Sequence, residues 1–473
     1  MKIRIAGYNI DERLIKEIKE QEKASPETIS AAYARISRSS KSVTELRDEA
    51  IGEVQKARRS NKNIIFDMGH SSIAEHAVFN IDIIGVSRYI TETIQKSRLA
   101  SFTEKSQRYV TLKDDYVIPA EIEGSPELKK EFVETCKTLF ALYKDLTDKI
   151  LEHYKKEGLD CSERQVKEMA KEDARYALPL ATKTQMGMTI NARSIEQLLR
   201  RLNGVELLEA KEISDVIHRE VKAISPSLIR YVDSDSFYDN QAKLRAKLFD
   251  SSETNSQLTT GDKFKTDVKI LTADAEERIL AAIVFNRYPQ DFEKLVEKLK
   301  SVSAEDKAKL FEELFSEMKA YHQTPREFEM VDLLVQCRVS ASCFAQLKRH
   351  RMMTIIRSEY ATEQGFFIPR IIEQIGEADR FSTTLENLSE MYDRLEIVKK
   401  GLGTYALTNA HAVNVLFKTN LRELYHFSRL RSDAHAQWEI RELSQHIDIE
   451  VKKLLPNAAR HLMGKDAFQS KRC

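Results

Sequence analysis

One order of structural elements occurs twice along this chain. Each copy begins with a helical stretch that ends in small residues, near residue 33 in the first copy and near residue 280 in the second. Each then has a turn led by a histidine, GHSSIAEH at 69–76 and YHQTPREFE at 321–329. Internal self-similarity of this kind indicates a duplicated structural unit. The two copies are therefore expected to adopt the same fold.

A strand pattern follows the histidine-led turn in both copies. Apolar and polar residues alternate over 79–83 and over most of 331–336, and a period of two indicates a strand. A basic segment comes next in each copy, at 95–110 and at 347–360. Long helical stretches fill the remainder, and the apolar residues within 191–202 share one helix face. The chain is predicted to be α+β and rich in helix, with one small sheet in each copy.

The polar segment between the copies sets the predicted domain boundaries. Residues 236–266 are rich in Ser, Thr, Asn and Asp and poor in aliphatic side chains, which is typical of a linker. A chain of 473 residues is also too long for one compact core. We expect a first domain at 1–235, a linker at 236–266 and a second domain at 267–473.

The charge balance and the cysteines exclude several classes of protein. Lys and Arg number 75 against 74 Asp and Glu, so no global field attracts a nucleic-acid polymer. The five cysteines are scattered and lack CxxC spacing, so neither a disulfide framework nor a metal cage is indicated. No apolar run reaches the length of a secretory signal or a membrane span. We expect a cytoplasmic protein with no metal and with neither a membrane nor a nucleic acid as partner.

Three strings in the chain resemble motifs of the flavin-dependent thymidylate synthases, the ThyX family. That family is recognised by an RHR triplet, a Ser-rich substrate loop and a late helix reading roughly LRxDxHAQWEI. The first copy carries SFTEKSQRYV at 101–110, which is similar to the substrate loop. The second copy carries RHR at 349–351 and LRSDAHAQWEI at 430–440. The chain therefore resembles a tandem, diverged duplication of one ThyX domain.

The resemblance implies an architecture and an assembly. Each copy would be a ThyX-like domain with a small, mostly antiparallel sheet and several long helices. The family subunit is about half as long as this chain and forms a homotetramer, so the two copies would pack as a pseudo-dimer. A homodimer of this chain would then be equivalent to the family tetramer.

The basic loop of the first copy is the predicted nucleotide site. Hydroxyls, backbone N–H groups and a guanidinium can converge there on a phosphate, although an arbitrary loop of this composition is more often solvated. The resemblance favours a nucleotide site and adds an arginine of the late helix. The predicted nucleotide-binding residues are Ser101, Glu104, Ser106, Gln107, Arg108 and Arg431.

The remaining matches to the family predict a flavin site. The triplet at 349–351 offers three donor side chains to the pyrophosphate or the N1/C2 edge of a flavin, or it is a basic helix end stabilised by the helix dipole. The predicted cofactor-binding residues of the first copy are His70, Ser72, Glu75, Lys96, Arg98, Asn191 and Arg193. Those of the second copy are His322, Thr324, Glu327, Arg349, His350, Arg351, Asn420, Arg422, His426 and His435.

Neither copy has every feature of the family. The first has Lys96, Ser97 and Arg98 at the RHR position and a different late helix. The second has Glu359 where the phosphate-binding serine aligns, and a carboxylate there would repel a phosphate. Because the losses are complementary, we expect one nucleotide site between the loop of the first copy and the late helix of the second.

The resemblance implies reductive methylation of dUMP to dTMP, with methylenetetrahydrofolate and NADPH as co-substrates and FAD as cofactor. No protein nucleophile attacks the pyrimidine in that family, so no catalytic residue is expected, and the protein's share is orientation and electrostatics. The altered RHR triplet leaves two alternatives open. One is a related flavin and folate reaction on another pyrimidine nucleotide, and the other is a non-catalytic homologue with decayed sites that binds nucleotide or flavin.

Overall fold

The computed structural model describes residues 1–11, 25–36, 39–158, 161–233, 266–287 and 291–470, together with Leu244. The chain divides by its contacts into two compact units. Unit 1 comprises 1–257 and 369–408, and unit 2 comprises 258–368 and 409–473. The predicted linker at 236–266 lies outside the described residues, apart from Leu244 and Thr266. The predicted boundaries at 235 and 267 stay a prediction, and so does the packing of the copies as a pseudo-dimer.

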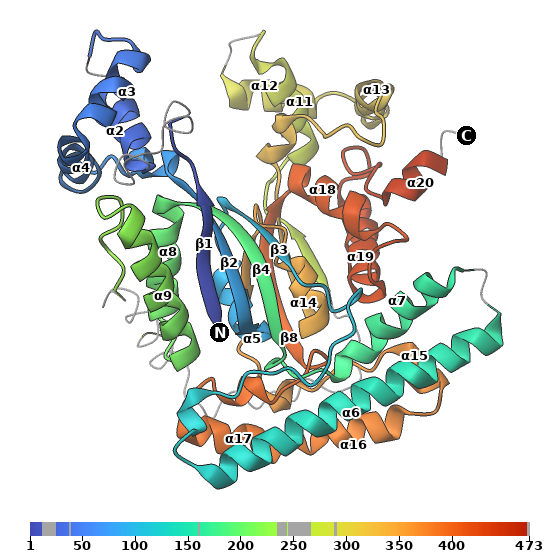
Figure 1. The fold of residues 1–473 in the computed structure, drawn as a ribbon. Helices are drawn as coiled ribbons and strands as arrows, with labels where there is room; N and C mark the ends of the chain where they lie inside the picture. Colours follow the sequence, from blue (N-terminus) through green and yellow to red (C-terminus); the bar gives the residue numbers. More distant parts are fainter. Residues whose placement is uncertain are drawn as a thin grey trace. The chain divides into compact units, whose positions relative to one another are not determined.

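Each unit is built on one four-stranded antiparallel sheet (Figure 1). The strand order is β1-β2-β4-β3 in unit 1 and β5-β6-β8-β7 in unit 2. The strands are β1 (Lys2–Tyr8), β2 (Val78–Ser87), β3 (Ala100–Glu104), β4 (Lys183–Asn191), β5 (Asp267–Ile270), β6 (Asp332–Ser340), β7 (Thr354–Arg357) and β8 (Ala412–Asn420). The alternating runs of the sequence lie in β2 and β6. The predicted α+β class, with one small antiparallel sheet in each copy, is confirmed.

Helices make up most of the remaining described residues. Unit 1 contains α2 (Glu27–Ile36), α3 (Val43–Gly52), α4 (Val54–Lys62), α5 (Arg88–Ile94), α6 (Pro126–Glu157), α7 (Glu163–Ala174), α8 (Ala192–Asn203), α9 (Leu208–Ile224), α15 (Arg370–Gln374), α16 (Ala378–Glu386) and α17 (Leu388–Val398). Unit 2 contains α11 (Ala275–Phe285), α12 (Phe292–Lys300), α13 (Ala304–Phe315), α14 (Ala341–Leu347), α18 (Leu421–Arg431), α19 (Trp438–Leu454) and α20 (Lys465–Ser470). Short helical turns are η1 (Asn63–Asp67), η2 (Ser71–His76), η3 (Ala120–Ile122), η4 (Arg175–Ala177), η5 (Arg326–Met330), η6 (Thr362–Gln364) and η7 (Gly403–Tyr405). None of the helices in the described part of the chain has the length and apolar character needed to cross a membrane.

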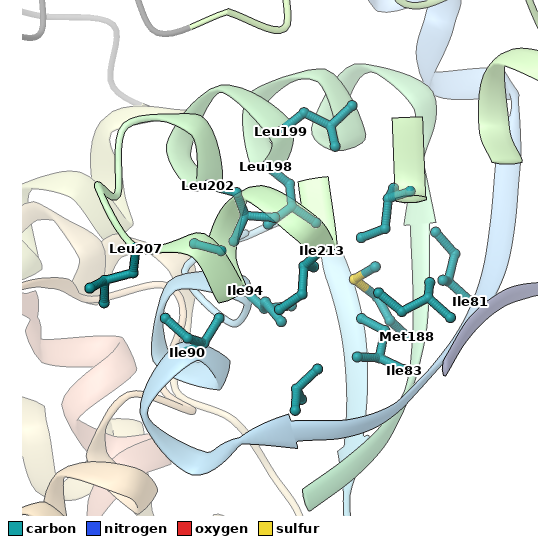
Figure 2. Packing of buried hydrophobic residues seen from close by; sticks show 14 of the residues in the cluster. Ile81, Ile83, Ile90, Ile94, Met188, Leu198, Leu199, Leu202, Leu207 and Ile213 are labelled. Atoms are coloured by element: carbon teal, nitrogen blue, oxygen red, sulfur yellow. The ribbon is translucent and has the colours of Figure 1, made fainter. Parts of the chain in front are cut away.

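The core of unit 1 contains side chains of the sheet and of α8 and α9 (Figure 2). Ile81 and Ile83 of β2 and Met188 of β4 are buried in one cluster with Leu198 and Leu202 of α8. Burying each such side chain stabilises the fold by roughly 1.5–3 kcal/mol. The helix face predicted from the apolar spacing in 191–202 is therefore the face that α8 buries.

A segment of the second sequence copy completes the core of unit 1. Residues 369–408 follow β7 along the chain, yet Leu395, Leu402 and Tyr405 are buried in the hydrophobic cluster of unit 1. The backbone N–H of Leu180 donates to the carbonyl of Leu407 at 2.7 Å. Charged pairs join α6 to α17, to α16 and to Glu377, the residue before α16. They are Arg394–Glu131, Arg380–Asp145 and Lys149–Glu377. The sequence pattern did not predict that a segment of the second copy belongs to unit 1.

The same polar contact ties a strand end to a helix in both units. Ser87, at the end of β2, donates from its backbone N–H and its hydroxyl to Glu209 of α9 at 2.6 and 2.7 Å. Ser340, at the end of β6, donates in the same way to Glu439 of α19 at 2.7 and 2.5 Å. In unit 1 the hydroxyl of Tyr405 donates to Glu209 as well, at 2.5 Å. A buried carboxylate needs such donors, so each contact is required for the packing around it.

Removal of the Tyr405 hydroxyl tests the attachment of residues 369–408 to unit 1. Glu209 is buried, and the loss of one donor to a buried acceptor costs about 1–3 kcal/mol. We expect Tyr405→Phe to lower the free energy of unfolding by that amount in urea denaturation. Tyr231→Phe is the control, because the Tyr231 side chain is largely exposed, and it should leave the stability unchanged. If the two substitutions change the free energy of unfolding equally, the Tyr405–Glu209 hydrogen bond does not stabilise the packing of residues 369–408 on unit 1.

Candidate functional site

A cavity of about 340 Å³ in unit 2 brings together five of the predicted cofactor-binding residues. His322 and Thr324 come from the turn before η5, and Asn420, Arg422 and His426 come from the end of β8 and from α18. Strands β6 and β8 pair antiparallel, so the chain entering β6 and the chain leaving β8 meet at one edge of the sheet. The sheet topology therefore builds this cavity.

Arg422 holds the two walls of the cavity together. Its Nε donates to the carbonyl of Thr324 at 2.9 Å, and its Nη2 donates to the side-chain oxygen of Gln323 at 3.0 Å. Its Nη1 forms an ion pair with Glu329 at 2.9 Å. The guanidinium is thus occupied by protein groups and positions the turn against α18.

Unit 1 repeats this contact between the turn and the helix. Arg193 of α8 forms an ion pair with Glu75 of η2. The sequence match aligns Glu75 with Glu327, but it is Glu329 that contacts Arg422 in unit 2. Glu327 and Glu329 are two positions apart in the same short turn and are the same residue type. Sequence spacing alone therefore does not identify which of them pairs with Arg422.

The two predicted asparagines begin helices. The side-chain oxygen of Asn191 accepts the backbone N–H of Ser194 at 2.8 Å, and that of Asn420 accepts the backbone N–H of Glu423 at 2.8 Å. These are N-cap contacts, which satisfy donors at the start of a helix. Each asparagine thus sets the direction in which α8 or α18 leaves its sheet.

The cavity offers hydrogen-bond donors beside an apolar rim. Thr324 is 3% exposed, and its hydroxyl has no hydrogen-bond partner among the described residues. Arg429 also lines the cavity, and its buried Nη1 likewise has no hydrogen-bond partner in the described part of the chain. Tyr321 and Met352 line the rim with largely exposed side chains. Ligand cavities span roughly 300–1,000 Å³, so this donor set and size are compatible with one end of a dinucleotide such as FAD, which has a flat ring system at each end.

A buried histidine and a half-buried arginine lie beside this cavity. The Nε of Arg431 donates to Nε2 of His350 at 3.0 Å, and its Nη1 donates to the side-chain oxygen of Gln346 at 3.2 Å. Nδ1 of His350 lies 3.5 Å from a carboxylate oxygen of Glu423, which lines the cavity. A guanidinium only donates, so Nε2 of His350 is the unprotonated nitrogen and Nδ1 carries the proton.

Burial controls the charge of both groups. Burial lowers the pKa of His350 to about 4, although the hydrogen bond with Glu423 raises it in part. Burial, with a further contribution from the charge of Arg349, lowers the pKa of Arg431 to about 10. At neutral pH the pair is therefore one neutral imidazole and one guanidinium cation. The sequence predicted these residues for different ligands, and the structure places them in direct contact.

The other predicted residues of unit 2 do not line this cavity. Arg349 is exposed and Arg351 is half-buried, and both follow α14, while Glu327 lies in η5. The side chain of His435 is 88% exposed, with Nδ1 2.9 Å from Asp433 and 3.8 Å from Asp466. The three side chains lie close enough together to present oxygen and nitrogen atoms to a metal ion. Their ion-pair contacts with one another explain why they lie close together.

The predicted nucleotide loop lies at the end of β3 in unit 1. Ser101 is exposed on the strand. Glu104 accepts hydrogen bonds from Gln95 at 2.9 Å and from Thr184 at 3.2 Å, and it forms an ion pair with Arg88 at 3.4 Å. Glu104 therefore serves a buried polar network, which fixes the strand end from which the loop begins.

Hydrogen bonds hold the loop itself in a turn. The Ser106 hydroxyl accepts the backbone N–H of Arg108 at 3.2 Å, and the Gln107 side chain is buried. Nε of Arg108 lies 2.5 Å from a carboxylate oxygen of Glu172 in α7. A phosphate at Arg108 would have to replace that carboxylate. Arg108 and Arg431 belong to different units, so the composite nucleotide site stays a prediction.

The remaining predicted residues of unit 1 are exposed. His70 directly precedes η2 and Ser72 lies within it, while Lys96 and Arg98 lie between α5 and β3. Their side chains are accessible at the surface of unit 1.

The sequence did not predict several residues of the site, among them Gln323, Glu329, Gln346, Glu423 and Arg429. One signal was present for Arg429, because Arg422, His426 and Arg429 have the spacing of a single helix face. The partners of Arg422 and His350 left no comparable pattern.

Relatives match this chain over most of its length or over about half. A UPF0159 protein of Thermoplasma acidophilum is 25% identical over 452 residues, which are 86% of this chain and 89% of the relative. A flavin-dependent thymidylate synthase of Clostridium tetani is 31% identical over 210 residues, which are 44% of this chain and 82% of the relative. A solved structure of the flavin-dependent thymidylate synthase from Helicobacter pylori, complexed with FAD and dUMP, covers 50% of this chain and 100% of that one, at 17% identity and a TM-score of 0.34.

One family model matches both sequence copies. The Thy1 model, described as thymidylate synthase complementing protein, matches residues 18–227 and 269–457. The two matched segments lie on either side of the polar segment, as expected for a duplication. The chain belongs to the Thy1 family of thymidylate synthase complementing proteins.

Proposed function

We propose that this protein converts dUMP to dTMP by reductive methylation, with FAD as cofactor and with methylenetetrahydrofolate and NADPH as co-substrates. The cavity of unit 2 carries the proposal, because it unites family-matched residues from distant segments, such as Thr324 and Arg422, which are 98 residues apart. The relative from Clostridium tetani is a flavin-dependent thymidylate synthase, and its reaction class supports the same chemistry here.

Different residues of the cavity would contact different parts of a flavin. FAD, when bound, supplies hydride transfer. The flat side chain of Tyr321 and the flexible one of Met352 offer apolar contact to a ring system. The Thr324 hydroxyl and the Arg429 guanidinium offer donors to carbonyl or phosphate oxygens. Glu329 is paired with Arg422, so this carboxylate does not oppose an anionic ligand with an unbalanced charge.

His350 orients Arg431 for the nucleotide. The neutral imidazole accepts from Nε of Arg431, and Gln346 accepts from Nη1, so the guanidinium is held from two sides. A guanidinium in a site of low dielectric interacts strongly with a phosphate or with an electron-rich ring edge. In this proposal His350 is a positioning residue, and Arg431 is the group that contacts the ligand.

Product analysis tests the proposed reaction. The full chain is incubated with FAD, dUMP, NADPH and labelled methylenetetrahydrofolate, and we expect labelled dTMP. A labelled product from another pyrimidine nucleotide would instead support the related flavin and folate reaction. Bound FAD with no turnover on any pyrimidine would support a non-catalytic protein. A protein that neither binds FAD nor gains thermal stability with dUMP contradicts every flavin-based proposal.

Two arginine substitutions test the composite nucleotide site. Arg108→Ala and Arg431→Ala should each weaken dUMP binding by about 1.5–3 kcal/mol, because each removes a charge-assisted hydrogen bond. Isothermal titration calorimetry measures the change. Glu172→Gln should strengthen binding, since Glu172 competes for Arg108. The control is Arg164→Ala, whose side chain is exposed and paired with Glu168. If both arginine variants bind dUMP as tightly as the wild type, the two copies do not form the composite nucleotide site.

The titration of His350 predicts a dependence of stability on pH. Burial lowers its pKa from the ordinary 6.5 to about 4 in the folded protein. The unfolded chain therefore binds a proton more readily as the pH falls below about 6.5, and protonation favours unfolding. This contribution to the free energy of unfolding is fully present above pH 6.5 and is lost between pH 6.5 and about 4, by at most about 3 kcal/mol.

Urea denaturation across that pH range measures the effect. His350→Gln should flatten the fall in stability, while the control His446→Gln should retain it. A wild-type profile that His350→Gln leaves unchanged would rule out a buried neutral imidazole at this position.

A further inference from the structure

A buried aspartate in unit 2 contacts the end of the helix that carries Arg431. Asp448 belongs to α19, and it is 4% exposed. The hydroxyls of Ser428 and Ser432 both donate to its Oδ2, at 2.7 and 2.6 Å. Ser428 lies three residues before Arg431 and Ser432 directly follows it. The two hydrogen bonds therefore hold the last turn of α18 against α19.

The residue that follows α18 is held from more than one side. The Ser432 hydroxyl also lies 2.8 Å from that of Ser444, which belongs to α19. Gly464 approaches so closely that a Cβ atom at this position would lie 2.6 Å from the carbonyl oxygen of Ser432. The backbone next to Arg431 is thus fixed, and from it the Nε of Arg431 reaches Nε2 of His350 at 3.0 Å.

The buried carboxylate is costly for the fold. Burial raises the pKa of Asp448 to about 6, although the hydrogen bonds from Ser432 and Ser428 lower it in part. The other carboxylate oxygen, Oδ1, is buried and has no hydrogen-bond partner among the described residues. A buried polar atom without a partner is unfavourable. Stability alone therefore does not explain an aspartate at this position.

Unit 1 has the same scaffold without these polar groups. Positions in the two units correspond when they are counted from the N-cap asparagines and from the glutamates that accept from the strand-end serines. The residues equivalent to Ser428, Arg431 and Asp448 are Leu199, Leu202 and His218. Leu199 and Leu202 are buried in the hydrophobic core of unit 1. The aspartate and its serine thus accompany the arginine in unit 2, and all three are replaced in unit 1.

We propose that Asp448 is a positioning residue for Arg431, whose backbone it fixes through Ser428 and Ser432. The role of Arg431 in binding dUMP rests on the proposed function, but its contact with His350 does not. Displacement of Arg431 would take the donor away from Nε2 of His350. It would also remove a charge that lowers the pKa of this imidazole. The imidazole therefore reports the position of Arg431 when no ligand is bound.

Substitutions of Asp448 in the full chain test the proposal. Asp448→Leu removes the acceptor, whereas Asp448→Asn retains an oxygen that can accept from both serines. Glu450→Gln is the control, because Glu450 lies on the same helix and pairs with Lys453. In an NMR titration of isotope-labelled histidine, we expect Asp448→Leu to shift the signal of His350 and to raise its pKa. Asp448→Asn and Glu450→Gln should have little effect on either.

The affinity for dUMP, measured by isothermal titration calorimetry, is the second readout. Asp448→Leu should weaken binding by about tenfold or more, as for the loss of a hydrogen bond to a charged group. Asp448→Asn should bind within about threefold of the wild type, because the acceptor is retained. Ser428→Ala provides a further variant with a small change of side chain. It removes one of the two hydrogen bonds and should change both readouts in the same direction as Asp448→Leu.

Two outcomes would overturn the proposal. One is a His350 signal that neither Asp448→Leu nor Ser428→Ala changes, and the other is an effect of Asp448→Asn as large as that of Asp448→Leu. If the wild type does not bind dUMP, the proposed function fails. The titration of His350 still decides in that case whether Asp448 positions Arg431.

Discussion

A buried glutamate carboxylate that accepts two hydrogen bonds from one serine fixes the geometry of both units. In unit 1 Ser87 and Glu209 make this contact, and in unit 2 Ser340 and Glu439 make it. Because a buried carboxylate without donors is costly, the strand end and the helix cannot separate independently. In unit 1 the same carboxylate also accepts from Tyr405. One interaction thereby orders the sheet, a helix and a distant segment of the chain.

The two units share a scaffold and differ in what they place on it. Both have an N-cap asparagine and an arginine paired with a glutamate of the preceding turn. Arg431 stands at the same distance along α18 from its capping asparagine as Leu202 does along α8. Leu202 is fully buried among apolar side chains, whereas Arg431 contacts His350. The equivalent position is therefore a core residue in unit 1 and a charged residue beside a cavity in unit 2.

Local patterns predicted the parts of the fold that depend on local chemistry. Alternating residues identified β2 and β6, and apolar spacing identified the buried face of α8, because both periods follow from backbone geometry. The position of residues 369–408 in unit 1 was not predictable, since it depends on long-range packing around Leu395 and Tyr405. At the site, the family strings indicated Arg422 and His350, but not their partners Glu329 and Glu423. Those contacts arise only when the sheet brings distant segments to one edge.

The place of residues 369–408 in the core of unit 1 has a consequence for how the protein is made. Translation proceeds from the N-terminus at about 5–20 residues per second. The sheet and helices formed by the first 233 residues must therefore wait on the order of ten seconds, with part of their apolar surface uncovered, until Tyr405 leaves the ribosome. Completion of the N-terminal unit is then linked to synthesis of most of the chain, so a truncated product exposes an aggregation-prone face.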